Sequence, residues 1–302
     1  MVETILSIAD SILFLCISLS GIYYFIFASA TTLRKTEKYP NAKQKHRYAL
    51  LLPTGTSLPV LNYPEELYDI HFYEQLHETV QALDDTKYDM AVILGRDSQV
   101  SATLLQEINN AYDAGIIAIQ LHHVIENRST RKLRWQAINE EINHAIFKQG
   151  HTLLGLSSAL DGMDIAVELK WLQKNLKSSK RNLERRLMRQ QVFTDYLADS
   201  IVSSPTARTR THEIRGKKVV SDLPEALLQG NWEYADKLLR QLLPSWKVLL
   251  ITTSTLAIAM SCYNGGLSIK WWVLLFCLLL TVSLAIPDYL VETKKKRKSK
   301  KD

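Results

Sequence analysis

Three long apolar segments dominate the pattern of hydrophobic and polar positions along this 302-residue chain. The first, residues 11–30, carries no charged side chain and is about as long as a helix that crosses a bilayer. Because it lacks the basic start and the small-residue cleavage pattern of a secretory signal, we expect a retained anchor. Residues 246–290 hold two further apolar runs on either side of Asn264-Gly265-Gly266, which is typical of a tight turn. They predict a transmembrane helical hairpin, the alternative being a hairpin buried in a soluble core.

The region between these segments, residues 47–243, alternates two kinds of apolar pattern. Short continuous apolar runs predict buried strands, and apolar positions spaced three or four residues apart predict amphipathic helices. The predicted strands are 48–53, 90–94 and 116–121, and the predicted helices are 102–114 and 134–147. Strands that alternate with helices predict an α/β fold with a mostly parallel sheet covered on both faces.

Charge adds a membrane orientation to this picture. Residues 34–47 and the tail 292–302 together hold 13 of the 37 Lys and Arg residues, and each basic cluster follows an apolar segment. Positive residues concentrate on the cytoplasmic side, so residues 47–243 and the tail are expected in the cytoplasm. The net charge of +6 therefore indicates contact with anionic lipid rather than with nucleic acid, for which the chain shows no motif. All three cysteines (Cys16, Cys262 and Cys277) lie in the apolar segments and predict neither a disulfide nor a metal cluster.

Several strings in the middle region carry a family resemblance. They are residues 63–70, the strand that runs to Asp97, and residues 118–123, 140–143, 150–160 and 230–237. Together they resemble the family 2 glycosyltransferases of bacterial envelope polysaccharide synthesis, particularly a membrane-anchored type found in Bacteroidetes. The resemblance implies a trimmed GT-A-like fold, a nucleotide-sugar donor, inverting transfer to a lipid-linked glycan, and a multi-pass protein of the bacterial inner membrane.

The predicted strand that ends near Leu94 departs from the family pattern at the metal site. The resemblance implies an Asp-x-Asp pair that holds Mn²⁺ or Mg²⁺ against the pyrophosphate, because hard cations prefer carboxylate oxygens. This chain has Gly95-Arg96-Asp97, so that Asp97 is the one carboxylate left to bind a cation. Arg96 could pair with Asp97, or its guanidinium could take the place of the cation beside a phosphate.

The family's catalytic base and acceptor motif are also altered. Aligning Leu183-Glu184 with the family's Leu-Glu step puts Lys180 where the family has an Asp base, and a lysine is protonated at neutral pH. Asp161 and Asp164 are the remaining candidate bases, with helix N-caps as an equal alternative. The acceptor motif Gln-x-x-Arg-Trp has its counterpart in residues 207–211, which keep Arg208 and Arg210 but lose Gln and Trp.

The histidines are weaker candidates for catalytic or metal-binding residues. His122 and His123 are adjacent on a predicted strand, so they should point to opposite faces, and we expect structural or pocket-lining roles rather than metal ligation. His151 follows Gly150 and is expected to be a hydrogen-bonded turn histidine.

Three functions are consistent with these residues. The first is a glycosyltransferase-like protein with lost or weakened catalysis, a partner of an active transferase in the same membrane. The second is an active inverting enzyme that uses Arg96 and Asp97 for the phosphates and Asp161 or Asp164 as base. The third is a scaffold at the membrane surface that uses only its apolar segments and basic tail.

Overall fold

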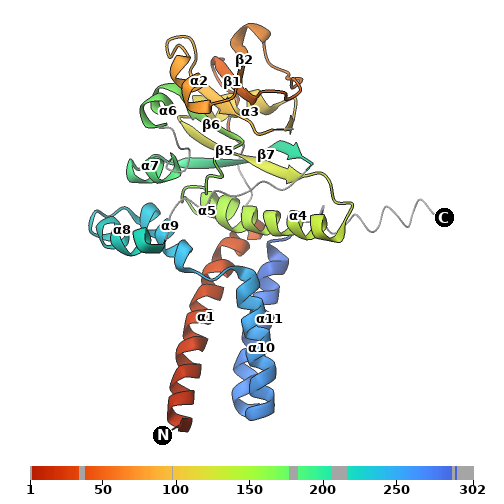
Figure 1. The fold of residues 1–302 in the computed structure, drawn as a ribbon, viewed down its shortest axis with the longest axis vertical. Helices are drawn as coiled ribbons and strands as arrows, with labels where there is room; N and C mark the ends of the chain where they lie inside the picture. Colours follow the sequence, from red (N-terminus) through yellow and green to blue (C-terminus); the bar gives the residue numbers. More distant parts are fainter. Residues whose placement is uncertain are drawn as a thin grey trace, which may run out of the picture.

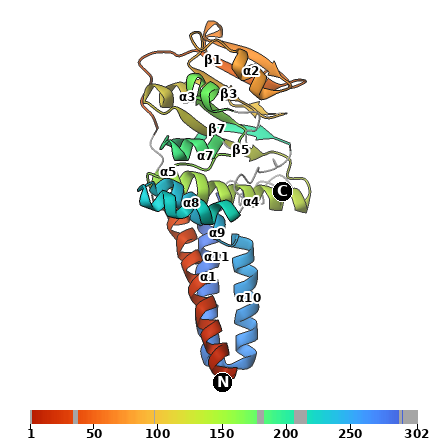
Figure 2. The same ribbon diagram turned by 60° about the vertical axis from the view of Figure 1, so that its left-hand side comes forward.

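The computed structural model describes residues 2–33, 38–96, 98–176, 183–205, 216–287 and 290. Three long helices, α1 (Val2–Leu33), α10 (Trp246–Tyr263) and α11 (Gly265–Leu284), stand side by side below an α/β region (Figures 1 and 2). All three are long and apolar enough to cross a membrane. The start of α1 and the turn between α10 and α11 lie at the end of the bundle remote from the α/β region (Figure 1).

A polar clamp joins α1 to α11 within this bundle. The Asp10 side chain, which is buried, pairs with Lys270 and accepts a hydrogen bond of 3.0 Å from Trp271 Nε1. A charge in apolar surroundings is costly unless it is paired, so this contact fixes the two helices against each other. The sequence pattern started the first apolar segment at residue 11, and the helix in fact begins earlier and includes Asp10.

One seven-stranded sheet forms the centre of the α/β region. Its strands are β1 (Tyr48–Pro53), β2 (Tyr68–Tyr73), β3 (Met90–Ile93), β4 (Gln99–Val100), β5 (Ala118–Ile125), β6 (Ile165–Glu168) and β7 (Thr194–Ser204). Their order across the sheet is β2-β1-β3-β6-β5-β7-β4. All but β6 and β4 run in one direction, which agrees with a mostly parallel sheet. The sequence pattern missed β6, which runs antiparallel between β3 and β5 in the middle of the sheet.

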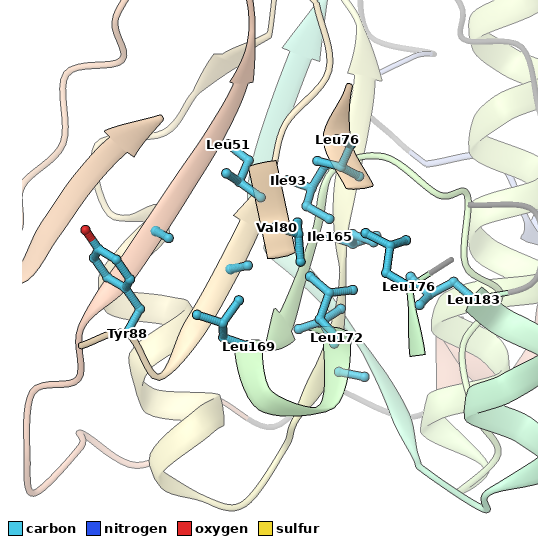
Figure 3. Close-up of a cluster of buried hydrophobic side chains, with 14 of the residues drawn as sticks. Leu51, Leu76, Val80, Tyr88, Ile93, Ile165, Leu169, Leu172, Leu176 and Leu183 are labelled. Carbon is cyan, nitrogen blue, oxygen red and sulfur yellow. The ribbon is translucent and has the colours of Figure 1, made fainter. Parts of the chain in front are cut away.

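Both faces of the sheet are covered, as the continuous apolar runs predict. On one face, Leu51 and Ile93 pack against α2 (Leu76–Ala82), α6 (Leu169–Asn175) and α7 (Leu183–Arg189), as Figure 3 shows. On the other face, Leu50 and Leu52 pack against α3 (Leu104–Asp113). Neighbouring residues of β1 thus serve opposite faces because side chains alternate along a strand.

A layer of helices separates the sheet from the three long helices (Figures 1 and 2). It contains α4 (Arg131–His144), a π-helical turn (Ala145–Gln149) and α5 (Gly150–Leu153), with α8 (Gly216–Leu228) and α9 (Trp232–Leu242) beside them. The predicted helix 134–147 therefore begins earlier than expected, after the N-cap Thr130, whose Oγ1 accepts from Leu133 N at 3.2 Å. The predicted strand 116–121 becomes β5, which extends four residues further, through both adjacent histidines.

Helix α1 packs directly on this layer. The Phe27 ring stacks on the His151 ring with 3.8 Å between their centroids. Gly150 lies so close to α1 that a Cβ on it would come within 2.4 Å of the Phe27 carbonyl oxygen. His151 is buried: its Nδ1 donates to the Ile146 carbonyl oxygen, and its Nε2 lies within hydrogen-bond distance of Tyr23 Oη and Asp236 Oδ2. It is hydrogen-bonded as expected, but it lies in a helix rather than in a turn. The α/β region therefore rests on the first long helix through close backbone contact.

Candidate functional site

The loop after β3 is the first candidate site, because ligands of α/β sheets bind beyond the carboxyl ends of the parallel strands. We call residues 95, 96 and 98 the Gly95 loop. The Gly95 N–H donates to Asp164 Oδ1 at 3.2 Å, and Ser98 Oγ donates to the Gly95 carbonyl at 2.9 Å. Arg96 is exposed at the surface of this loop, and Asp97 lies outside the described residues.

Asp164 is turned toward the Gly95 loop and away from solvent. Its side chain is 1% exposed, and its backbone adopts a positive φ of 54° directly before β6. Its carbonyl oxygen accepts from Leu121 N at 2.8 Å and from Gln120 Nε2 at 3.1 Å. The alternative of a helix N-cap is wrong for Asp164, since the following residues enter the sheet as β6 rather than a helix.

Asp161 faces a different partner, although it precedes Asp164 by only three residues. Its Oδ2 lies 2.5 Å from the ammonium of Lys148, whose side chain is fully buried in the π-helical turn. The Asp161 N–H donates to Gln120 Oε1 at 2.8 Å, so the amide of Gln120 holds both ends of the 161–164 turn. Asp161 also does not cap a helix. Neither candidate base of the sequence analysis presents a free carboxylate to solvent.

The remaining residues of the sequence analysis lie outside the described part of the chain. Lys180, at the position of the family's base, is among them, as are Arg208 and Arg210 of the acceptor motif. Leu183 and Glu184 are described, and both are buried. The Glu184 carboxylate accepts from Leu160 N at 3.0 Å and contacts the Lys237 ammonium, which ties α7 to the chain before Asp161.

A cavity of about 930 Å³ lies beside β7, at a place that the sequence did not indicate. Its lining includes Tyr39, Glu107 and Asp195, with Lys38 and Asp199 at an exposed ion pair of 2.8 Å. Tyr39 Oη donates to Asp195 Oδ2 at 2.6 Å, and burial raises the pKa of the Asp195 carboxyl above its ordinary value. Polar residues interrupt β7, so the strand gave no apolar run from which to predict it.

Two histidines and a glutamate cluster between β5 and α4. We call His122, Glu141 and His144 the His122 cluster. One possible ligand atom from each lies within 4.8 Å of the others. The sequence analysis considered His122 together with His123 and set ligation aside because of strand alternation. The structure instead groups His122 with two residues of α4, and it pairs His123 Nδ1 with Glu140 at 2.5 Å.

These distances allow a test of the expected Mn²⁺ or Mg²⁺ site. Within the described ranges, the side chains that converge well enough to hold an ion are those of the His122 cluster. At the Gly95 loop, the carboxylate that contacts the described residues is that of Asp164, and its Oδ1 already accepts from Gly95 N. Hard cations take several oxygen ligands, so these residues do not by themselves fit Mn²⁺ or Mg²⁺.

Comparison with known proteins adds one likeness. No protein-family model matches this chain, and no curated protein matches it either. Among solved structures it is similar to the mannosyltransferase PcManGT from Pyrobaculum calidifontis, in complex with GDP-Man and Mn²⁺. The TM-score is 0.49 at 10% sequence identity, over 92% of this chain and 96% of that one. So distant a likeness leaves the function to be argued from the residues themselves.

Proposed function

We propose that this chain is a membrane-bound, glycosyltransferase-like protein of envelope polysaccharide or glycolipid assembly, in which metal-dependent catalysis is lost or weakened. In this role it would act as the partner of an active transferase in the same bacterial inner membrane. The proposal rests on the sequence strings that resemble family 2 glycosyltransferases, on the three apolar helices, and on the arrangement of carboxylates around the Gly95 loop.

One observation carries the loss of catalysis: the Asp164 carboxylate binds the Gly95 N–H where the resemblance implies a metal-binding acid. Sugar transfer from a nucleotide sugar needs a neutralised pyrophosphate and a base that removes the acceptor proton. Asp164 is 1% exposed and fixes the loop, and Asp161 pairs with buried Lys148. Both carboxylates are thus engaged in contacts within the protein. To act as a base or a metal ligand, either one would have to give up these contacts.

A membrane partner role also fits the way the parts are joined. The layer of α4 and α5 packs on α1, so the carboxyl ends of the strands are held at a fixed place relative to the long helices (Figure 2). The basic segment 34–47 comes next in the sequence after α1 and suits a surface of anionic lipid. An active transferase with a lipid-linked glycan would meet this protein at that surface.

The second candidate is an active inverting transferase, and the cavity beside β7 favours it. A volume of about 930 Å³ suits a small-molecule ligand, and a buried carboxyl with a raised pKa in a cavity is a candidate base. In that case Asp195 would take the place of the missing family base, and Arg96 with Asp97 would contact the donor phosphates. A membrane-surface scaffold is a third possibility, in which the cavity beside β7 binds no nucleotide sugar.

Calorimetry on the detergent-solubilised full chain separates these candidates. A panel of nucleotide sugars is titrated with and without Mn²⁺, and transfer to lipid extracts is followed with radiolabelled donor. We expect no Mn²⁺-stimulated transfer, and no change when Asp97 is replaced by Ala. Manganese-dependent turnover that Asp97→Ala or Asp195→Asn abolishes, while Asp199→Asn leaves it intact, would establish the enzyme instead.

Co-purification tests the partner role. The tagged chain is extracted in mild detergent from its native membrane, and bound proteins are assayed for sugar transfer. Recovery of a transferase activity that wild-type chain retains and a chain lacking residues 2–33 loses is the expected result. Absence of both nucleotide-sugar binding and transferase recovery would leave the scaffold.

A further inference from the structure

We infer that the His122 cluster is a binding site for a divalent transition-metal ion of the Zn²⁺ type, placed where the α/β region meets the long helices. Its ligands would be His122 Nε2, a Glu141 carboxylate oxygen and a His144 ring nitrogen. Two histidines and a glutamate are a ligand set that zinc uses in proteins. The inference concerns metal binding alone and does not depend on sugar transfer.

The first support is the spacing of the three side chains. Glu141 and His144 are three residues apart on α4, so they lie on one face of that helix, opposite His122 on β5. His122 Nε2 is 3.2 Å from Glu141 Oε2 and 3.3 Å from Oε1, and the His122 and His144 ring centroids are 5.4 Å apart. Metal bonds of about 2.0–2.2 Å place tetrahedral ligand atoms roughly 3.5 Å apart, so small side-chain shifts complete the site.

The second support is the direction of the hydrogen on His122. Its Nδ1 is 2.9 Å from the Ala198 carbonyl oxygen, which can only accept, so Nδ1 carries a hydrogen and donates it. In the neutral ring, Nε2 then presents a lone pair toward the Glu141 carboxylate, which also only accepts. A cation between these two acceptors turns a repulsive contact into two bonds. Ligating histidines are commonly oriented by a carbonyl acceptor on the other ring nitrogen, as His122 is here.

The third support is the balance of charge. The Glu141 side chain is 7% exposed, and a buried carboxylate is costly without a positive partner. Nearby cations and donors are engaged elsewhere: Lys148 pairs with Asp161, and His123 bonds Glu140 and Ser204 Oγ. His122 is the residue within ion-pair distance of Glu141, at 3.2 Å, and a divalent ion between them would bring the positive charge that a neutral His122 ring does not.

The cluster is also open to a ligand. A cavity of about 250 Å³ is lined by all three side chains, by Thr31 and Thr32 at the end of α1, and by residues 284–287 at the end of α11 and just beyond it. Three protein ligands leave a coordination position for water or another oxygen ligand facing this cavity, as in zinc sites that are not closed. The α4 layer lies between the sheet and the long helices in both views (Figures 1 and 2), which places the ion at the membrane end of the α/β region.

Cobalt titration tests the site with a spectroscopic signal. The full chain is purified in detergent, stripped with a chelator and titrated with Co²⁺, whose visible absorption is strong only in low-symmetry sites. We expect one equivalent to bind, Zn²⁺ to displace it, and affinity to fall more than about tenfold in Glu141→Gln and His122→Ala. Glu141→Gln is close in shape to the native residue, so it reports on ligation even where His122→Ala disturbs folding.

Two controls locate the ion. His71→Ala removes a half-buried histidine of β2, at the opposite part of the sheet, and should leave Co²⁺ binding unchanged. Asp97→Ala should also bind one equivalent, which separates this site from any cation at the Gly95 loop. The inference is overturned if wild-type protein binds no equivalent of Co²⁺ or Zn²⁺, or if Glu141→Gln binds as tightly as wild type.

Discussion

The Gly95 loop and the His122 cluster each contain a buried carboxylate, and the two carboxylates differ in the group that they face. At the loop, Asp164 faces a backbone N–H, so a donor meets an acceptor and the contact is complete. At the cluster, Glu141 faces the Nε2 of His122, and in the neutral ring, with the hydrogen on Nδ1, an acceptor meets an acceptor. The first arrangement holds a loop in place, and the second can be completed by a proton on His122 or by the metal ion that we infer. Among the described residues, converging metal ligands are thus found at the His122 cluster rather than after β3.

One short turn connects the two regions. Asp161 points to Lys148 on the side of the cluster, and Asp164 points to the loop, while the buried amide of Gln120 binds the backbone between them. A change at either acid should therefore report on one region at a time. Two of the tests below use these acids, and two use other contacts, at Gly150 and Asp195.

The largest effect is expected for Asp161→Ala. Removing this carboxylate takes away the anion that lies 2.5 Å from the buried Lys148 ammonium, and breaking a buried pair costs about 3–5 kcal/mol. Thermal unfolding of the detergent-solubilised chain measures the loss. Asp199→Ala is the matched control, because its ion pair with Lys38 is exposed and screened by solvent, so its loss should change stability little. Equal losses in the two variants would show that Asp161 is not a structural ion pair.

Apolar runs predicted the centre of the fold well. The strands at 48–53 and 90–94 became β1 and β3 because their residues are buried on both faces of a covered sheet. The short β6 and the polar β7 were missed, since neither has a run long enough to stand out from loops. Their place in the sheet depends on pairing with distant strands, which spacing along the chain does not encode.

The candidate site was harder to predict for a related reason. Asp161 and Asp164 were recognised as the acids that remain, but their partners Lys148 and Gly95 are distant in sequence, so their structural use was not visible. Strand alternation argued against His122 as a ligand because only its neighbour His123 was considered. The pairing with α4 could have been suspected from Glu141 and His144, which share a helix face three residues apart.

The second test concerns the Gly95 loop. Asp164→Ala leaves the Gly95 N–H without its carboxylate acceptor, which should lower the free energy of unfolding by about 1–3 kcal/mol. Alanine at a positive φ should lower it by roughly 1 kcal/mol more. Asp164→Asn keeps an acceptor oxygen and tolerates this backbone, so its stability should stay near wild type. Chemical denaturation of both variants checks the difference. A strong loss in Asp164→Asn as well would mean that the negative charge itself is needed, as in a metal site.

The third test concerns the contact between α1 and the layer beneath the cluster. In Gly150→Ala the new methyl group would come within 2.4 Å of the Phe27 carbonyl oxygen, so the backbones must separate. Overpacking of this kind costs about 1–3 kcal/mol. Gly265→Ala is the control, because a Cβ there meets no atom within 4 Å. Melting temperatures in detergent should fall for Gly150→Ala alone, and an unchanged value would mean that α1 is not docked on α5.

The smallest effect is expected at Asp195, a buried carboxylate whose partners are neutral. Its pKa is raised by burial, although hydrogen bonds from Tyr39 and from the Tyr196 N–H oppose the shift. The folded state therefore holds this proton to a higher pH than the unfolded state, where the group titrates near about 3.9. Wild-type stability from this group is full below that pH and declines as pH rises through the folded pKa. Asp195→Asn can still accept from Tyr39 and carries no charge to bury, so it should be more stable than wild type at neutral pH, by about 1 kcal/mol or less. The advantage should disappear on acidification toward pH about 4.

Chemical unfolding of both proteins across this pH range measures the difference in their stability. An advantage of Asp195→Asn that grows in acid would show instead that the carboxylate is stabilised by a cation in the cavity.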